Sequence, residues 1–517
     1  MPLFRSSTSS APVQPRSWLH RHKFIAAAAV VVLVAAGLAV WQPWKPCGPG
    51  MQAEGSPHIC VGLNLEGSSF GAHDAVELLR ERVKQHNAEV AGPEFVTVVV
   101  LDNMTPDVEQ DSLGEANVRH GVEGALTAAW RANNSLVANG KLPRVKLQLA
   151  NYGNGAVHHA DAVREIVAAK DSAHIVAVVG LGQSLNTTRA AAAALSEAGI
   201  AVVSSMASAD NMNQHVDDTG RYIRRFFRIT PTNVDAGRAA ATHVHQSGYE
   251  KVMLVQDTNP ADIYSLTLGR AFRDSYKELL GHDIADVLTY TSPKDSGDIP
   301  RAEYMEKMFA DTHARICLED PDLVYFAGRG ADLRPFLQTL SQNGQCDRPE
   351  VDILTSDDAS NVVSQPLPAL TDSGVRLFYT SVATRGQWNG PGQEENRARY
   401  EEFEEVFGQL GFNAEVDLLN GYAMSTHDAV LVATAAARMV PSVMTNTTNV
   451  ADWIKKFDCV QPYLGVTGKI AYKTDPAVQG NPVDKAMPIL RLEPDGRPVQ
   501  VGLVWPSGQP FGPQSCG

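Results

Sequence analysis

The amino-acid sequence predicts an α/β protein with two doubly wound parallel sheets, preceded by one N-terminal transmembrane helix. Three observations lead to this prediction: the length of the chain, two separate series of alternating apolar runs and helical patterns, and one long uncharged run near the N-terminus. A chain of 517 residues exceeds what one hydrophobic core usually supports, so two globular units of roughly 150–200 residues are expected. With 44% hydrophobic and 20% charged residues, the composition is typical of an ordered protein.

The first series of strands and helices begins at residue 95. Short runs rich in β-branched residues predict strands, and apolar residues at helical spacing predict the helices between them. The predicted strands are 95–101, 145–150, 175–180 and 200–204, and the predicted helices are 121–132, 160–169 and 188–198.

The second series begins at residue 251. Its predicted strands are 251–255, 286–290, 323–327 and 351–354, with a helix at 266–280. Short apolar strands separated by helices imply parallel sheets with right-handed crossovers, one sheet for each series. A last portion, with a strand at 375–380 and helices at 394–407 and 417–439, is too short for a third domain. We therefore expect it to complete the first sheet.

An uncharged run extends from Phe24 to Trp44. A helix of that length matches a hydrocarbon core of about 30 Å. The cationic residues Arg5, Arg16, Arg21 and Lys23 precede the run, which places the N-terminus in the cytoplasm and everything after the run outside. We expect a cytoplasmic tail at 1–23, a single-pass anchor in the cell membrane at 24–44, and an extracytoplasmic body. A cleaved signal peptide ending near Ala39 is the alternative.

The six cysteines of an exported body are expected to form disulfides, because these bonds persist in oxidising compartments. Several connectivities are open, and proximity in the sequence favours Cys47 with Cys60, Cys317 with Cys346, and Cys459 with Cys516. The first pair would staple a segment at 45–95, which we interpret as a spacer or cap after the anchor. A metal or redox site is the alternative, but the spacing that such sites use is missing.

Charge and motifs exclude several classes of protein. The formal net charge is −14, so nucleic acid is not an expected partner. Gly180-Leu181-Gly182 lacks the third glycine of a dinucleotide loop, and no His-Glu-x-x-His motif occurs. His243 and His245 would point in different directions on a helix, so they cannot share a metal. We expect no catalysis, no cofactor and no metal.

Seven segments form an ordered series: VVGLGQS at 178–184, GIAVVSSMAS at 199–208, FRITPTN at 227–233, GYEKV at 248–252, DLVYFAG at 322–328, residues 422–437, and TGKIAY at 467–472. In order and spacing this series resembles the type I periplasmic solute-binding proteins, specifically the leucine/isoleucine/valine-binding group. The resemblance covers roughly residues 96–501. It implies lobe I at 96–228 and 373–460, lobe II at 229–372 and 466–510, and a hinge of three crossovers near Thr230, Thr371 and Gly465.

Ligands of open parallel sheets bind beyond the carboxyl ends of the strands, so the loops that follow strands are the candidate site. In lobe I these loops carry Ser184, Ala207 and Ser208. The resemblance implies that the hydroxyls of both serines and the backbone of Ala207 hold the carboxylate and ammonium groups of an amino acid. The alternative is that the two hydroxyls only cap helices.

In lobe II the resemblance points to Tyr264, Arg329 and Asp357. Tyr264 matches the tyrosine that lines the cleft in this family, although ordinary packing at a helix start is the alternative. Related amino-acid binders often carry an acid where this chain has Arg329. Asp357 could supply that acid, whereas Arg329 would favour an anionic group through bidentate pairing. An exposed surface arginine is the alternative there.

The function implied by the resemblance is that of a binding protein without catalytic activity. Its two lobes would close on a small polar ligand, an amino acid or related carboxylate, and serve an ABC permease or a sensor in the membrane. The alternative is a membrane-anchored sensor or structural ectodomain on the same fold that has no transport role. A hydrolase is a distant third.

Overall fold

The computed structural model describes residues 47–55, 58–71, 74–106, 114–217, 219–293, 301–341, 351–363, 365–372, 374–441, 447–473, 475 and 478–516. The cytoplasmic tail and the membrane anchor, expected at 1–23 and 24–44, lie outside these residues. Within the described ranges, no helix combines the length and the apolarity needed to cross a membrane.

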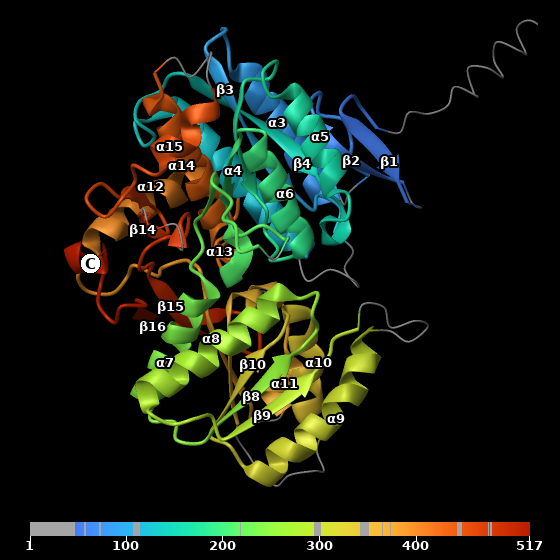
Figure 1. The fold of residues 1–517 in the computed structure, drawn as a ribbon, viewed down its shortest axis with the longest axis vertical. Helices are drawn as coiled ribbons and strands as arrows, with labels where there is room; N and C mark the ends of the chain where they lie inside the picture. The colour runs from blue at the N-terminus through green and yellow to red at the C-terminus, as the bar shows by residue number, and fades with distance from the viewer. Residues whose placement is uncertain are drawn as a thin grey trace, which may run out of the picture. The chain divides into compact units, whose positions relative to one another are not determined.

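The first sheet, as far as the chain is described, has seven strands in the order β1-β2-β4-β3-β5-β6-β7, and Figure 1 labels its strands β1 to β4. The pairs from β4 to β7 are parallel, and β1 and β2 add two antiparallel pairs at one edge. All six residues of β5 are buried, which explains its continuous apolar sequence. The strands are β1 Met51–Glu54, β2 Ile59–Asn64, β3 Phe95–Asp102, β4 Arg144–Asn151, β5 Ile175–Gly180, β6 Ala201–Ser204 and β7 Phe226–Arg228.

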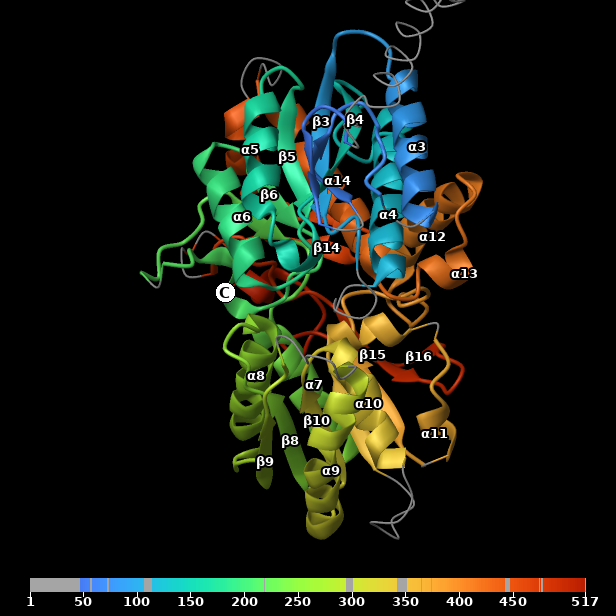
Figure 2. The ribbon, with the colours of Figure 1, turned by 90° about the vertical axis from the view of Figure 1, so that its right-hand side faces the viewer.

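Helices cover both faces of the first sheet and build a separate core on each. Apolar residues of α3, α4, α12, α14 and α15 form one core, and those of α5 and α6 form the other. Figure 2 shows α5 and α6 on one side of the strands and α3 and α4 on the other. These helices are α3 Asp74–Glu89, α4 Glu115–Asn134, α5 His159–Ala169, α6 Asn186–Glu197, α12 Glu394–Gln409, α14 Tyr422–Met439 and α15 Val450–Ile454; the short α13 is Ala414–Asp417.

The second sheet has the strand order β16-β15-β12-β11-β10-β8-β9. Its pairs from β9 to β12 are parallel, and β15 and β16 are antiparallel additions at the edge. The strands are β8 Val252–Asp257, β9 Asp286–Tyr290, β10 Leu323–Ala327, β11 Asp352–Thr355, β12 Arg376–Thr380, β15 Met487–Leu492 and β16 Pro498–Val504.

Two layers of helices enclose the second sheet. Apolar residues of α7 and α8 form the core on one face, and those of α9, α10 and α11 form the core on the other. These helices are α7 Asn233–Ser247, α8 Ile263–Leu280, α9 Arg301–Glu319, α10 Gly330–Ser341 and α11 Pro368–Asp372. The expectation of two doubly wound α/β lobes is therefore confirmed, with parallel strands in the centre of each sheet and antiparallel strands at one edge.

Three expectations about the organisation of the chain are wrong. The strand near residue 375 does not return to the first sheet, because β12 pairs with β11 in the second. The chain consequently crosses to lobe I after Thr380 and not near Thr371. It leaves lobe I only after Ala486 and not near Gly465, since β13 (Tyr463–Gly465), β14 (Gly468–Ile470) and Ala486 place side chains in the lobe I core. The segment 45–95 is no mere spacer, because β1, β2 and α3 belong to the sheet and core of lobe I.

The disulfide between Cys47 and Cys60 is present as expected and joins the start of the described chain to β2. Cys317 and Cys459 are also disulfide-bonded. Cys346 lies outside the described residues, and the side chain of Cys516 is not described, so their expected pairings stay predictions.

Candidate functional site

The order of the parallel strands places the candidate site. In lobe I the winding reverses between β3 and β5, and in lobe II it reverses between β8 and β10. Ligands of doubly wound sheets bind where the loops after such a strand pair diverge. In lobe I, Asp102 is the last residue of β3 and Ser184 lies in the loop after β5, and in lobe II the loops hold Asp262 and Arg329.

The loop after β5 is pressed against Asp102. Gly180 has φ +94°, and a Cβ there would lie 2.6 Å from the carbonyl oxygen of Leu101, so only glycine fits. Leu181 also has a positive φ of 50°. A Cβ on Gly182 would lie 3.0 Å from Oδ2 of Asp102. The loop that carries Ser184 thus lies directly beside a buried carboxylate.

Ser184 is buried, and both its hydroxyl oxygen and its carbonyl oxygen accept hydrogen bonds. Its hydroxyl accepts a hydrogen bond from the backbone N–H of Ala209 at 3.0 Å, and its carbonyl accepts one from Arg329 at 3.0 Å. The capping alternative is wrong here, because Leu185 is the N-cap of α6 and no side chain caps that helix.

Ala207 and Ser208 lie next to each other in the loop after β6, but they differ in their hydrogen bonds. The N–H of Ala207 donates to the hydroxyl of Ser204, and its carbonyl accepts from the buried Arg228. Ser208 is 3% exposed, and its hydroxyl completes no hydrogen bond with any described residue. It caps no helix either, since Thr232 caps α7. That hydroxyl faces Asp357 of lobe II closely enough to lower the pKa of the carboxyl group.

Tyr264 lies at the start of α8, where Asp262 caps the helix by accepting from the N–H of Tyr264 at 3.1 Å. The ring is 2% exposed and packs in the core of lobe II. Its hydroxyl donates to Oδ1 of Asp357 at 3.0 Å and accepts from the N–H of Asp358 at 3.2 Å. Tyr264 therefore fixes both aspartates of this loop and is more than a packing residue.

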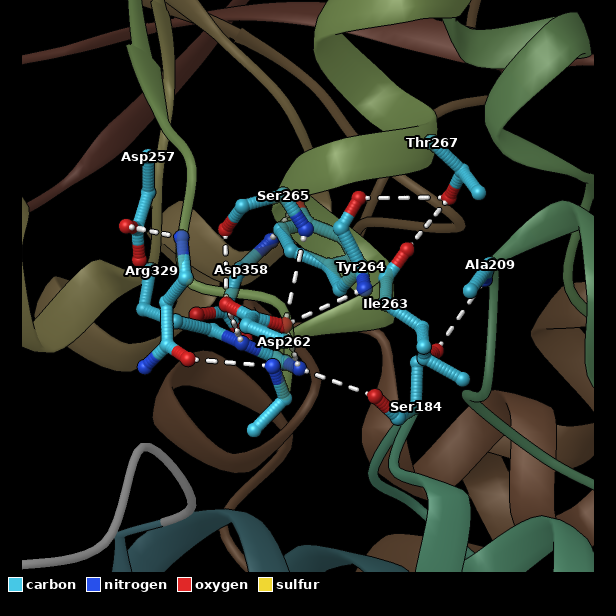
Figure 3. A network of polar contacts seen from close by, with 12 residues as sticks. Ser184, Ala209, Asp257, Asp262, Ile263, Tyr264, Ser265, Thr267, Arg329 and Asp358 are labelled. Carbon is cyan, nitrogen blue, oxygen red and sulfur yellow. Dashed lines mark hydrogen bonds and ion pairs between the residues drawn. The ribbon is translucent and has the colours of Figure 1, made fainter. Parts of the chain in front are cut away.

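Arg329 is buried, so the exposed-surface alternative is wrong. Its guanidinium donates to both carboxylate oxygens of Asp262, at 2.6 and 2.9 Å (Figure 3). It also lies 3.8 Å from Oδ1 of Asp358 and 4.6 Å from the centre of the Tyr264 ring. The bidentate pairing that we expected for a ligand anion is thus already made with Asp262. Burial alone would lower the pKa of Arg329, but Asp262 and Asp358 outweigh it and raise that pKa.

Burial raises the pKa of three carboxyl groups at this place. Burial raises the pKa of Asp357, while the hydrogen bonds from Tyr264 and Ser356 and the nearby hydroxyl of Ser208 lower it. Burial also raises the pKa of Asp358 to about 6, although Arg329 and the N–H of Gly330 oppose it. On the lobe I side, burial raises the pKa of Asp102 to about 6 against a hydrogen bond from Tyr152.

The structure thus brings Ser184, Ser208, Tyr264, Arg329 and Asp357 to one junction of the two lobes. Sequence reasoning missed Asp102, Asp262, Asp358 and Tyr422, the first residue of α14. Asp102 directly follows a predicted strand, which could have identified it. Asp262 pairs with a residue 67 positions away, and no local pattern indicates that.

A group of metal-ligand type exists elsewhere in lobe I. Single ligand atoms of His120, Glu123 and Asp417 lie within 4.8 Å of one another. Arg119 donates to Glu123 at 2.8 Å and to Asp417 at 3.0 Å, so a guanidinium already supplies positive charge there. Both carboxyl groups of this set therefore already accept hydrogen bonds from a cationic side chain.

Comparisons with known proteins agree with this architecture. No protein-family model and no curated protein matches the chain. An ABC transporter substrate-binding protein from Desulfitobacterium hafniense, in complex with Leu, is 19% identical with a TM-score of 0.55, over 79% of this chain and 99% of that one. A leucine-binding protein from Thermotoga maritima is 18% identical with a TM-score of 0.56, over 81% and 99%. A solute-binding protein from R. palustris, in complex with 4-hydroxybenzoate, is 14% identical with a TM-score of 0.57, over 79% and 96%.

All three of these proteins are substrate-binding or solute-binding proteins. At such identities the likeness shows the fold alone. The chain has the two-lobed α/β fold of the type I periplasmic binding proteins, as the sequence resemblance implied.

Proposed function

We propose that the protein is an extracytoplasmic solute-binding protein that closes its two lobes on a small polar ligand, an amino acid or related carboxylate. The observation that carries the proposal is the meeting of Ser208 from lobe I with Tyr264 and Asp357 from lobe II. Ser208 has a buried hydroxyl without a completed hydrogen bond. Leaving such a group unpaired is costly, and a ligand between the lobes would satisfy it.

The ligand would make contacts to both lobes at once. A ligand that touches both sides stabilises the closed form by its difference in affinity for the closed and open forms. The crossovers after Arg228, Thr380 and Ala486 would serve as the hinge. Solved proteins with this fold bind leucine and 4-hydroxybenzoate, which supports a small molecule with a charged end as the ligand.

The partners and location belong to the same proposal. The uncharged run at 24–44 would hold the protein in the cell membrane as a single-pass anchor, with the body outside the cytoplasm. The disulfide between Cys47 and Cys60 fits an oxidising compartment. An ABC permease or a membrane sensor would receive the loaded protein, and no reaction would be catalysed.

A thermal-shift screen of amino acids, aromatic carboxylates, amines and sugars tests the proposal. A ligand at 100 times its dissociation constant should stabilise the protein by about 2.7 kcal/mol. For a ligand that is found, calorimetry on Ser208→Ala should show a loss of about 1.5–3 kcal/mol in binding free energy, the range for a hydrogen bond to a charged group. Ser172→Ala, an exposed serine after α5, is the control and should bind as the parent does. An unchanged affinity in Ser208→Ala would place the ligand elsewhere.

One observation favours the second candidate, a sensor or structural ectodomain without transport. The lobes already touch directly: Arg329 donates to the carbonyl of Ser184, and Asn117 donates to Asn361. Such contacts could hold the lobes together without a ligand. A screen in which no compound raises the melting temperature would favour this second function over the first.

A further inference from the structure

Four buried or nearly buried carboxylates line the lobe junction: Asp102 of lobe I and Asp262, Asp357 and Asp358 of lobe II. Among the described residues, Arg329 is the cation that lies beside these carboxylates. Its two close hydrogen bonds go to Asp262, and Asp358 lies farther away at 3.8 Å. The arginine therefore balances one carboxylate and leaves an excess of negative charge.

Asp357 and Asp102 make no ion pair with any described residue. Asp357 accepts hydrogen bonds from the neutral hydroxyls of Tyr264 and Ser356, and Asp102 accepts one from Tyr152. Another buried cation, Arg228, donates to the backbone carbonyls of Ala207 and Ala209. Its charge is shared with Asp210 and Asp235, so it does not offset the excess at the junction.

These carboxylates surround a common place. Burial raises the pKa of the Tyr422 hydroxyl well above its usual value, and Asp358, Asp102 and Asp357 raise it further. Tyr422 lies at the start of α14 in lobe I. Aspartates from both lobes thus lie near enough to this one side chain to raise its pKa.

Ser208 gives an independent indication of a ligand at this place. Its hydroxyl is buried, faces Asp357 and completes no hydrogen bond with a described residue. When that hydroxyl donates toward the carboxylate, its lone pairs are open to an N–H donor. A carboxylate and a hydroxyl that face each other in this way form a receptor for an ammonium group.

We propose that the ligand carries a net positive charge, with an ammonium group that pairs with Asp357 and donates to the hydroxyl of Ser208. This inference rests on the proposed function and narrows it to basic amino acids and related amines. A zwitterion would bring no net charge to relieve the excess, and its carboxylate would find Arg329 already paired. A second carboxylate on the ligand would add to the repulsion.

Calorimetry with three probes of one carbon skeleton tests the inference: lysine as the cation, norleucine as the net neutral analogue, and 2-aminoadipate as the anion. We expect lysine to bind at least tenfold more tightly than norleucine, and 2-aminoadipate to bind more weakly than both. If norleucine or 2-aminoadipate binds as tightly as lysine or more tightly, the inference is overturned while the proposed function stays intact. Failure of the whole thermal-shift panel, amines included, would instead overturn both.

The variant Asp357→Asn keeps the size of the side chain and removes its charge. It should reduce the preference for lysine over norleucine by at least tenfold, whatever its effect on either affinity alone. Asp495→Asn, at an exposed turn before β16, is the matched control and should keep the parent's preference. The ratio of the two affinities within one variant does not depend on how much of the sample is active. An unchanged preference in Asp357→Asn would overturn the assignment of Asp357.

Discussion

The buried ion pair between Arg329 and Asp262 permits a quantitative test of how the lobe II side of the junction is held. Arg329 makes two charged hydrogen bonds to Asp262 and one to the carbonyl of Ser184. Arg329→Ala leaves Asp262 buried without its cation, and Asp262→Ala leaves Arg329 with Asp358 at 3.8 Å as its remaining carboxylate. Removal of one partner of a buried pair typically costs about 3–5 kcal/mol, because the remaining charge is uncompensated.

The double variant removes both charges together and should therefore lose less than the sum of the single losses. We expect a coupling energy of about 2–3 kcal/mol, at the upper end for residues in contact. The free energy of unfolding of the four proteins, measured in urea, provides the cycle.

The exposed pair Arg238–Glu278, whose atoms lie 2.7 Å apart, is the control for this cycle. An exposed ion pair is worth about 0.2–1 kcal/mol. A coupling for Arg329 and Asp262 no larger than that of this surface pair would refute the view that Arg329 is committed to Asp262.

Two further predictions concern lobe I. Burial raises the pKa of Asp102 from 3.8 to about 6, so its ionisation costs stability as pH rises through that window. The stability of Asp102→Asn relative to the parent should therefore increase by up to about 3 kcal/mol from pH 3.5 to pH 8, and a difference that is the same at both pH values would contradict this. Gly180→Ala should lower the melting temperature more than Gly92→Ala. Both glycines have φ near +90°, but only at Gly180 would the added Cβ contact a backbone atom. An equal decrease in melting temperature for the two variants would contradict this reasoning.

Much of the strand pattern could be predicted from the sequence. The bounds of β5, β9 and β10 agree with the prediction, because each is a short, mostly apolar run between loop residues. β1 was missed because its residues are half-buried or exposed at the edge of the sheet and leave no apolar signal. β12 was assigned to the wrong sheet, since an apolar run does not show which sheet it joins. The tendency of consecutive strands to lie side by side would have favoured its place beside β11.

The candidate site could be predicted in its position but only partly in its chemistry. Ser184 and Arg329 were located by the rule that loops after parallel strands form the site. The state of Arg329 could not be predicted, because its partner Asp262 lies on a different loop and is brought near only by the tertiary fold. The unpaired hydroxyl of Ser208 likewise depends on lobe I meeting lobe II.

Small-angle scattering with and without a saturating ligand tests the central claim most directly, that the lobes close on a solute. The account predicts that the radius of gyration of the parent protein decreases on binding, and that Tyr264→Ala, which loses the residue that orients Asp357, shows a smaller decrease. A ligand that binds by calorimetry without any decrease in the radius of the parent protein would contradict closure.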